Sequence, residues 1–193
     1  MDNQLFFYQV DADYIAYLLN CDKKVPKIDY SASNAHEKFL CGIVLTVNNH
    51  DYFAPISSFR TQQRTNIIIK DDNGKDVSSI RFSFMIPVPN GVISIKQIAD
   101  EPSPNYRILL NMELRYCRKN ENAIRSRAKF VYEAVTIKND PLMIKNCCDF
   151  KKLEAACAEF EKSKCTASKD LKSRIEESVN NRNSQKSHSS PEL

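Results

Sequence analysis

The feature that most constrains the fold is a change of hydrophobic periodicity near Ser103. Before this residue, short runs rich in aromatic and β-branched residues alternate with turn-forming residues, as in Leu5 to Val10 and Asn66 to Lys70. Such runs are typical of β-strands. After Ser103, apolar residues recur every three or four positions, which is typical of amphipathic helices. Strands followed by helices predict an α+β fold.

Turn and cap residues give the expected elements their limits. A helix should begin after Asp11, and the quartet Asn48 to Asp51 should join two strands into a hairpin. We expect a further strand from Ile80 to Val88. Ser103 and Pro104 suit the cap and first position of a long helix, a second helix should cover residues 121–135, and Asp149 should cap a third.

Length and composition predict one domain that stays in the cytoplasm. The 193 residues suit a single domain over residues 1–165, with a marginal helix and a disordered polar tail over residues 166–193. No apolar run is long enough to span a bilayer, and the N-terminus lacks a secretory signal. The seven cysteines are odd in number and lack zinc-site spacing, so we expect reduced thiols, no metal and no cofactor. The pair Cys147 and Cys148 is interpreted as packing.

The basic charge lies in one segment. Residues 104–138 carry a net charge of +5, although the whole chain carries only +4. Within the helix expected there, a set of polar and basic residues recurs at helical spacing and predicts an RNA-binding face: Arg107, Asn111, Arg115, Arg118 and the neighbouring Lys119. A solvated helix face with no ligand is the alternative interpretation.

A second candidate site is the sequence YFAPISSFR from Tyr52 to Arg60, where an apolar strand ends in two serines and a cation. The hydroxyls of Ser57 and Ser58, the backbone amides of the turn and the Arg60 guanidinium could together bind a phosphate. An ordinary serine-rich turn beside a solvated arginine would have the same composition.

Several motifs, in order along the chain, resemble the ToxN/AbiQ/CptN family of type III toxin–antitoxin toxins. They are FFYQVDADYIAYLLNCDKKVP, KFLCGIVLTVNNHDYFAPISS, RFSFMIPVPN, NYRILLNMELRYCRKN and the weaker CDFKKLEAACAEF. Together they span most of residues 5–160. The resemblance implies a compact, strongly bent antiparallel β-barrel core, related to MazF and Kid, with surrounding helices. It also implies a sequence-selective endoribonuclease toxin that needs no metal and cleaves RNA at A-rich sites.

The resemblance also assigns catalytic residues. Members of the family usually have Thr-Ser-Pro-Lys where this chain has Ser57-Ser58-Phe59-Arg60, so Ser58 takes the central role. Arg60 in place of lysine can hold charge but cannot readily transfer a proton. The family's other lysine and its loop tyrosine correspond to Lys38 and Tyr30, which we expect to move protons, with His36 as an alternative base. In such a mechanism the ribose 2′-OH attacks the phosphorus and leaves a 2′,3′-cyclic phosphate.

The expected partners are both RNA. The resemblance implies that a repeat RNA antitoxin with a pseudoknot-like fold inhibits the toxin and is processed by it, that toxin and antitoxin close into a ring, and that cellular or phage RNA is the substrate. Growth arrest or abortive infection of phage would follow. Two other functions stay open: an RNA-binding module with impaired catalysis, and a protein-binding inhibitor on a CcdB-like barrel.

Overall fold

The computed structural model describes residues 4–27 and 39–165 and has an α+β architecture. The chain forms two compact units, Met1–Cys157 and Ala158–Leu193, and the first contains all the labelled strands and helices. The strands are β1 (Phe6–Val10), β2 (Leu40–Val47), β3 (His50–Ser57), β4 (Asn66–Lys70), β5 (Asp76–Arg81), β6 (Ile86–Pro87) and β7 (Ile93–Ile95). The labelled α-helices are α1 (Ala12–Cys21), α2 (Pro104–Lys119), α3 (Glu121–Thr136) and α4 (Pro141–Asn146), and a further helix covers residues 150–165. The predicted limit at residue 165 stays a prediction, and the predicted tail lies outside the described residues.

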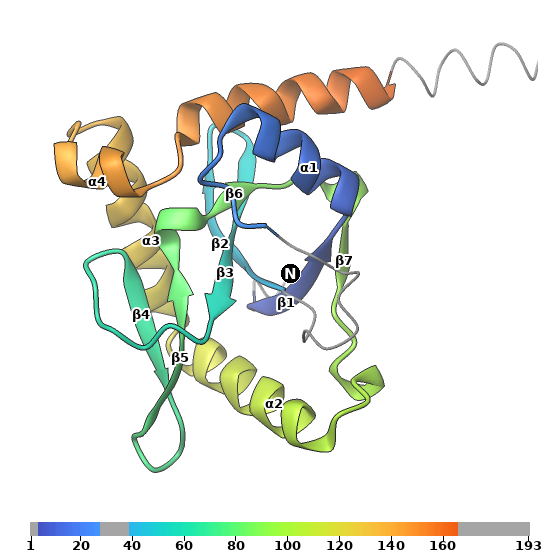
Figure 1. Ribbon diagram of the computed structural model, residues 1–193, viewed down its shortest axis with the longest axis vertical. Helices are drawn as coiled ribbons and strands as arrows, with labels where there is room; N and C mark the ends of the chain where they lie inside the picture. The colour runs from blue at the N-terminus through green and yellow to red at the C-terminus, as the bar shows by residue number, and fades with distance from the viewer. Residues whose placement is uncertain (1–3, 28–38, 166–193) are drawn as a thin grey trace, which may run out of the picture. The chain divides into compact units, whose positions relative to one another are not determined.

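The seven strands form one antiparallel sheet in the order β4-β5-β3-β2-β1-β7, with β6 paired to β3. Figure 1 shows β4 and β5 on one side and β1 and β7 on the other, with β2 and β3 between them. Among the described residues the terminal strands β4 and β7 do not pair, so the sheet is open. The predicted α+β class is confirmed, whereas the predicted strongly bent β-barrel core of the MazF and Kid type is not.

Strand β3 explains why the sheet divides instead of closing. Its first half pairs with β6 through Tyr52 and Phe53, and its last two residues, Ile56 and Ser57, pair with β5. The strand therefore exchanges one neighbour for another along its length. The β4–β5 hairpin pairs with the end of β3 through β5 and lies apart from β1 and β7 (Figure 1).

The hairpin between β2 and β3 agrees with the sequence. Asn48 and Asn49 both have positive φ, 50° and 61°, as both residues of a type I′ hairpin turn require. Asparagine tolerates that conformation. Within β2, Gly42 lies directly beneath the Phe53 ring: a Cβ on Gly42 would lie 2.0 Å from the Phe53 Cδ1 atom. Glycine is required there because the ring occupies the space of a side chain.

The strand predicted from Ile80 to Val88 is wrong in detail. β5 already begins at Asp76 and ends at Arg81, and residues Phe82–Phe84 form a 3-10 turn before the short β6. In this turn the carbonyl of Ser83 accepts a hydrogen bond from the Cys148 amide at 2.8 Å. Phe82 and Ser83 are adjacent and both buried, which breaks the alternation of buried and exposed side chains that a strand requires. The backbone at Ser83 bonds to Cys148 and not to a neighbouring strand. The break leaves Arg81 at the end of β5.

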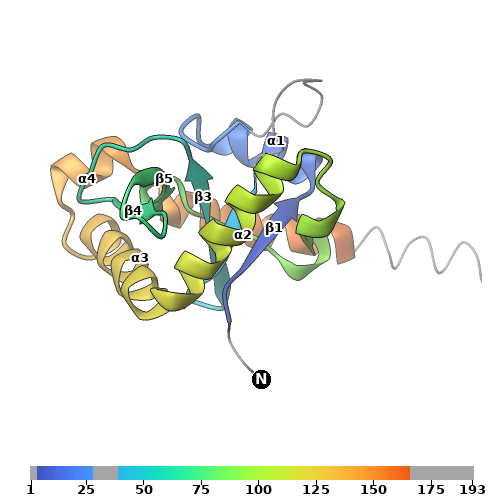
Figure 2. The same cartoon turned by 90° about the horizontal axis from the view of Figure 1, so that it is seen from below.

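The helices begin where the sequence predicts. Ser103 accepts a hydrogen bond from the Tyr106 amide, and Asp149 accepts one from the Lys152 amide, so both residues act as N-caps. Figure 2 shows α2 crossing one side of the strands, with α3 next to it along the chain. Helix α4, capped by Asp140, was not predicted, because six residues are too few for a clear helical pattern.

A buried polar network holds the hairpin against the helices. Glu154 is 8% exposed and accepts hydrogen bonds from Tyr132 at 2.6 Å and from Tyr52 at 2.9 Å. Lys151 adds an ion pair at 3.1 Å. Burial acts to raise the pKa of Glu154, but these donors more than offset it and hold that pKa below its ordinary value. The carboxylate is therefore charged and well satisfied.

Candidate active site

The turn that follows β3 holds two of the predicted catalytic residues in a defined conformation. Ser57, the last residue of β3, accepts a hydrogen bond through Oγ from the Phe59 amide at 3.2 Å. The Phe59 carbonyl accepts a hydrogen bond from the Ser79 hydroxyl at 2.6 Å, which ties the turn to β5. Ser57 is half-buried, whereas Ser58 and Arg60 are exposed. The turn is thus fixed at its base and open at its tip.

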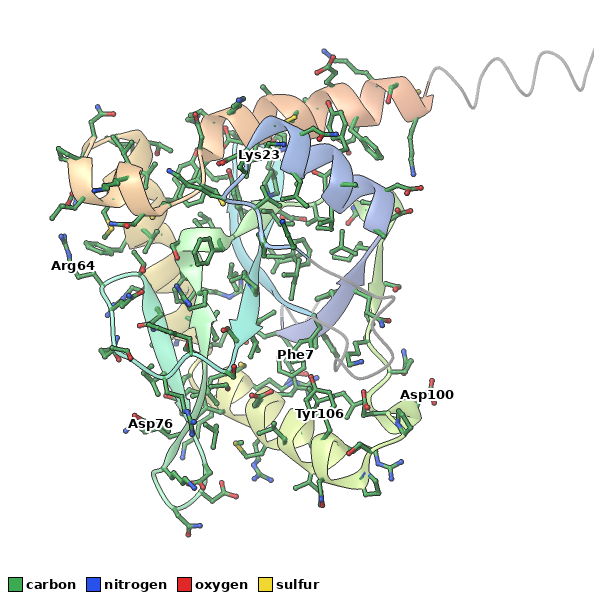
Figure 3. All side chains as sticks on the ribbon, in the orientation of Figure 1. Phe7, Lys23, Arg64, Asp76, Asp100 and Tyr106 are labelled. Carbon is green, nitrogen blue, oxygen red and sulfur yellow. The ribbon has the colours of Figure 1, made fainter. Side chains whose placement is uncertain are left out.

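Ser57 and Ser58 line a pocket of about 530 Å³, which we call the Ser57 pocket. Its walls come from β3, β5, the 3-10 turn at Phe82–Phe84 and α2 and are mainly apolar: Pro55, Ile56, Val77, Phe84, Tyr106 and Leu109. Figure 3 shows Tyr106 projecting from α2 toward the strands. Arg60 belongs to the same turn but is not a lining residue. The structure therefore brings the two serines together at the pocket but does not place Arg60 in its lining.

Two of the predicted catalytic residues cannot be placed. Lys38 and Tyr30 lie outside the described residues, as does the alternative base His36. Among the described residues near this segment in the sequence, Pro26 and Phe39 line the Ser57 pocket. The proposed contributions of Lys38 and Tyr30 stay predictions.

Arg81 is a pocket residue that the sequence analysis missed. Its guanidinium carbon lies 4.3 Å from the centre of the Phe59 ring and 4.9 Å from the centre of the Phe84 ring. Its Nε is buried and has no hydrogen-bond partner within residues 4–27 and 39–165. Burial lowers the pKa of this guanidinium. The signal in the sequence was the arginine that opens RFSFM, followed by two aromatic residues, which we interpreted only as part of a strand.

Glu113 is the second residue that the sequence analysis missed. It is 3% exposed, lies on the inward face of α2 and lines the Ser57 pocket. Burial raises its pKa to about 7, although the hydroxyl of Ser78 opposes part of the rise. A carboxyl that titrates near neutrality can accept and donate a proton under ordinary conditions. Its spacing from Leu110 and Cys117, both fully buried, was the signal that it faces inward.

The predicted RNA-binding face of α2 is partly engaged with the protein itself. Arg115 forms an exposed ion pair with Asp72 at 2.7 Å, and Arg118 donates to the Leu5 carbonyl at 3.1 Å while packing on Phe6. The other members are Arg107, which donates to the Ala99 carbonyl, Asn111, which donates to the Arg107 carbonyl, and Lys119, which is exposed in the last turn. The set thus remains a candidate surface.

Over the described ranges, no group of three or more histidine, cysteine or carboxylate side chains is arranged to hold a metal ion. All seven cysteines are free thiols. Cys147 and Cys148 are fully buried, and burial raises the pKa of Cys147 to about 11, so packing describes them better than reactivity. None of the helices in the described part of the chain is long and apolar enough to cross a bilayer.

The open α+β sheet places two serines and one arginine, Arg81, at a pocket beside a strand end, and side chains of these types are able to bind a phosphodiester. Comparison with known proteins identifies the family. The sequence pattern of the family described as toxin ToxN of type III toxin–antitoxin systems matches residues 6–158. The chain belongs to this family.

Curated relatives agree with this assignment. The chain is 27% identical over 179 residues to the endoribonuclease ToxN of Bacillus thuringiensis subsp. kurstaki, covering 88% of this chain and 91% of the relative. It is also 27% identical over 171 residues to the endoribonuclease AbiQ of Lactococcus lactis subsp. lactis, covering 82% and 90%. The predicted family and the predicted enzyme class are confirmed by these matches.

Solved structures extend the likeness to the fold. A bacterial type III toxin–antitoxin structure that concerns selective toxin inhibition by a non-coding RNA pseudoknot superposes with a TM-score of 0.75 at 26% identity, covering 82% of this chain and 98% of that one. AbiQ, a lactococcal anti-phage endoribonuclease of the type III system, superposes with a TM-score of 0.73 at 25% identity, covering 82% and 99%.

Proposed function

We propose that this chain is a metal-independent, sequence-selective endoribonuclease toxin that acts on RNA in the cytoplasm. Membership of the ToxN family supports the class. The observation that carries the proposal is the placement of Ser57 and Ser58 at the pocket, in a turn that also contains Arg60 and lies against Arg81. Hydroxyl donors and guanidinium groups are the side chains expected around a phosphate that gains negative charge.

The chemistry needs only groups that the RNA and the protein can supply. The ribose 2′-oxygen forms a bond to the neighbouring phosphorus while the bond from phosphorus to the 5′-oxygen breaks, which leaves a 2′,3′-cyclic phosphate and a 5′-hydroxyl. One proton leaves the 2′-OH and one is added to the 5′-oxygen. Ser58 donates a hydrogen bond to a phosphoryl oxygen in the transition state, and Ser57 and Arg60 hold the added charge.

Proton transfer is assigned to groups other than Arg60, because a guanidinium does not deprotonate at neutral pH. Lys38 and Tyr30 are the candidates that the family resemblance supplies. Glu113 is a third, since it lines the same pocket and burial raises its pKa to about 7. Replacing each in turn and comparing pH–rate profiles separates them, because only the true donor or acceptor removes one limb of the profile.

The α2 face supports the second half of the proposal, control by an RNA antitoxin. A solved structure similar to this chain concerns toxin inhibition by a non-coding RNA pseudoknot, and another concerns a processed non-coding RNA in a bacterial antiviral system, with a TM-score of 0.65 at 27% identity. The exposed cations on α2 suit phosphate contacts with such a folded RNA. We propose that this chain binds and processes a repeat RNA, that the two assemble into a closed ring, and that growth arrest or phage defence follows.

One experiment tests the catalytic proposal. Purified protein is incubated with cellular RNA in EDTA, and the new ends are mapped and tested for a 2′,3′-cyclic phosphate. The Ser58→Ala protein should retain its fold and lose about a hundredfold or more in rate. Ser126→Ala, which removes an exposed serine on α3, is the matched control and should cleave normally.

Each alternative gives its own result. If the protein binds RNA but produces no cleavage fragments, the RNA-binding module with impaired catalysis is favoured. The observation that supports this alternative is Arg60, which stands where the family usually has a lysine. Toxicity that persists without RNA cleavage, together with a protein partner retained after ribonuclease treatment, would favour the CcdB-like inhibitor. Full cleavage by the Ser58→Ala protein would remove Ser58 from the mechanism.

A further inference from the structure

Two pockets in the structure share a wall. The Ser57 pocket, described above, and a second pocket of about 440 Å³ are both lined by Arg81 and Phe84. We call the second the Arg64 pocket, because Arg64 lines it together with Gln63 and Asn146. Figure 3 shows Arg64 at the outer edge of the loop between β3 and β4, near α4. The shared wall makes the pockets adjacent.

The two pockets differ in chemistry. Apolar side chains dominate the Ser57 pocket, whereas the Arg64 pocket combines the apolar Leu142 and Met143 with Gln63, Asn146 and Ser83, and Phe84 lies beside them. The Asn146 amide nitrogen donates to the Leu142 carbonyl at 2.7 Å, and its amide oxygen remains as an acceptor. Amide side chains can pair with the edges of nucleobases, and an aromatic ring can stack on their faces. Arg64 is 62% exposed at its side chain, and its ion pair with Asp140 is long at 3.4 Å. Such a surface pair contributes little stability, so the cation can turn to a ligand at small cost.

Arg81 lies at the junction with its charge unneutralised. The rings of Phe59 and Phe84 hold the guanidinium, but no carboxylate pairs with it among the residues that the structure describes. Glu113 lines the Ser57 pocket too, yet neither side chain alters the pKa of the other. A partly buried cation without a partner is costly to keep. A phosphate between the pockets would satisfy it, since the guanidinium fork matches phosphate oxygens.

We infer that the Arg64 pocket is a second nucleotide subsite, and that Arg81 binds the RNA phosphate lying between the nucleotide in that pocket and the one in the Ser57 pocket. This inference rests on the proposed endoribonuclease function. The ligand is single-stranded RNA, because the Phe84 ring lines both pockets and an aromatic ring stacks on bases that are unpaired. Recognition of the two nucleotides is then divided between the mainly apolar Ser57 pocket and the more polar Arg64 pocket.

The first test replaces Arg81. Arg81→Met keeps most of the length of the side chain and its packing between the rings but removes the charge, and Arg81→Lys restores a charge without the fork. We expect kcat/KM for an RNA with a mapped cleavage site to fall about a hundredfold in Arg81→Met and less in Arg81→Lys. Binding of the same RNA made uncleavable by a 2′-O-methyl group should weaken in parallel. Lys129→Met, an exposed cation on α3 that lines neither pocket, is the control.

The second test asks whether the Arg64 pocket holds a nucleotide. RNAs are shortened on one side of the cleaved bond and then on the other. Shortening on the side that enters the Arg64 pocket should lower the wild-type kcat/KM about tenfold. It should have almost no further effect on the protein that carries both Arg64→Ala and Asn146→Ala, because changes at interacting groups are not additive.

The outcomes separate this inference from the function on which it rests. If the wild-type protein cleaves no RNA, the proposed function itself is wrong. If the wild-type protein cleaves, but Arg81→Met cleaves and binds equally well, the inference is overturned and the function stands. If RNA shortening lowers kcat/KM of the double variant as much as it lowers that of the wild type, the second subsite is also overturned. That variant decides the question even if Arg81→Met does not fold.

Discussion

Replacing Glu113 with glutamine should stabilise the protein at alkaline pH. The carboxyl is 3% exposed, and burial raises its pKa from 4.5 to about 7. The folded state therefore holds this proton more tightly than the unfolded chain does. The stability that the protonated carboxyl provides is complete below pH 4.5, declines as the pH rises through the interval from 4.5 to about 7, and is lost above it.

The magnitude follows from the two pKa values. A difference of one pKa unit corresponds to about 1.4 kcal/mol, so ionised Glu113 lowers the free energy of unfolding by roughly 3 kcal/mol at pH 8. Glutamine resembles the protonated carboxyl in shape and carries no charge. The E113Q protein should thus exceed the wild type by about 1 kcal/mol or less at pH 5 and by about 2 to 3 kcal/mol at pH 8.

Urea unfolding at pH 5, 6, 7 and 8 measures this difference, provided that the slope against urea stays the same in both proteins. Glu161→Gln, which alters an exposed glutamate, is the control and should show no such trend. An E113Q protein whose stability differs from the wild type by the same amount at pH 5 and pH 8 would refute the reasoning. RNA cleavage by the same variant shows whether the carboxyl is also needed for catalysis.

Three further predictions concern packing, the buried network and the basic helix. Gly42→Ala should lower the free energy of unfolding by about 1 to 3 kcal/mol, since its Cβ would lie 2.0 Å from the Phe53 ring; thermal unfolding against Gly91→Ala, where the space is open, measures it. Tyr132→Phe should cost about 1 to 3 kcal/mol in urea unfolding, because Glu154 loses its 2.6 Å hydrogen bond. Arg115→Glu with Lys119→Glu should weaken antitoxin RNA binding and flatten its salt dependence while leaving cleavage of free RNA unchanged; equal loss of both activities would show a single RNA surface.

Local chemistry accounts for what the sequence predicted well. The Asn48-Asn49 turn, the Ser103 and Asp149 caps and the strand from Asn66 to Lys70 all depend on residues close in sequence, so their patterns survive folding. The strand expected from Ile80 to Val88 failed because the 3-10 turn at Phe82–Phe84 depends on a hydrogen bond from Cys148, about 65 residues away.

The candidate site shows the same division. Ser57, Ser58 and Arg60 were visible because a strand end, two hydroxyls and a cation are adjacent in the chain. Arg81 and Glu113 were missed because their importance arises from tertiary packing. Arg81, at the end of β5, packs on the Phe59 ring in the turn after β3, and Glu113 lines the pocket from α2. The open sheet was missed for a related reason. Whether the terminal strands β4 and β7 pair depends on where β3 changes from β6 to β5 as its neighbour, and this change arises only in the folded chain.

The central claim is that the attacking group is the 2′-hydroxyl of the RNA at the Ser57 pocket. The most direct measurement compares two RNAs that carry the mapped cleavage site and differ only in one 2′-hydroxyl, replaced by hydrogen at the scissile nucleotide. The account predicts that the wild-type protein cleaves the first in EDTA and leaves the second intact, although it binds both. Cleavage of the deoxy-substituted RNA at the same bond and a similar rate would contradict it.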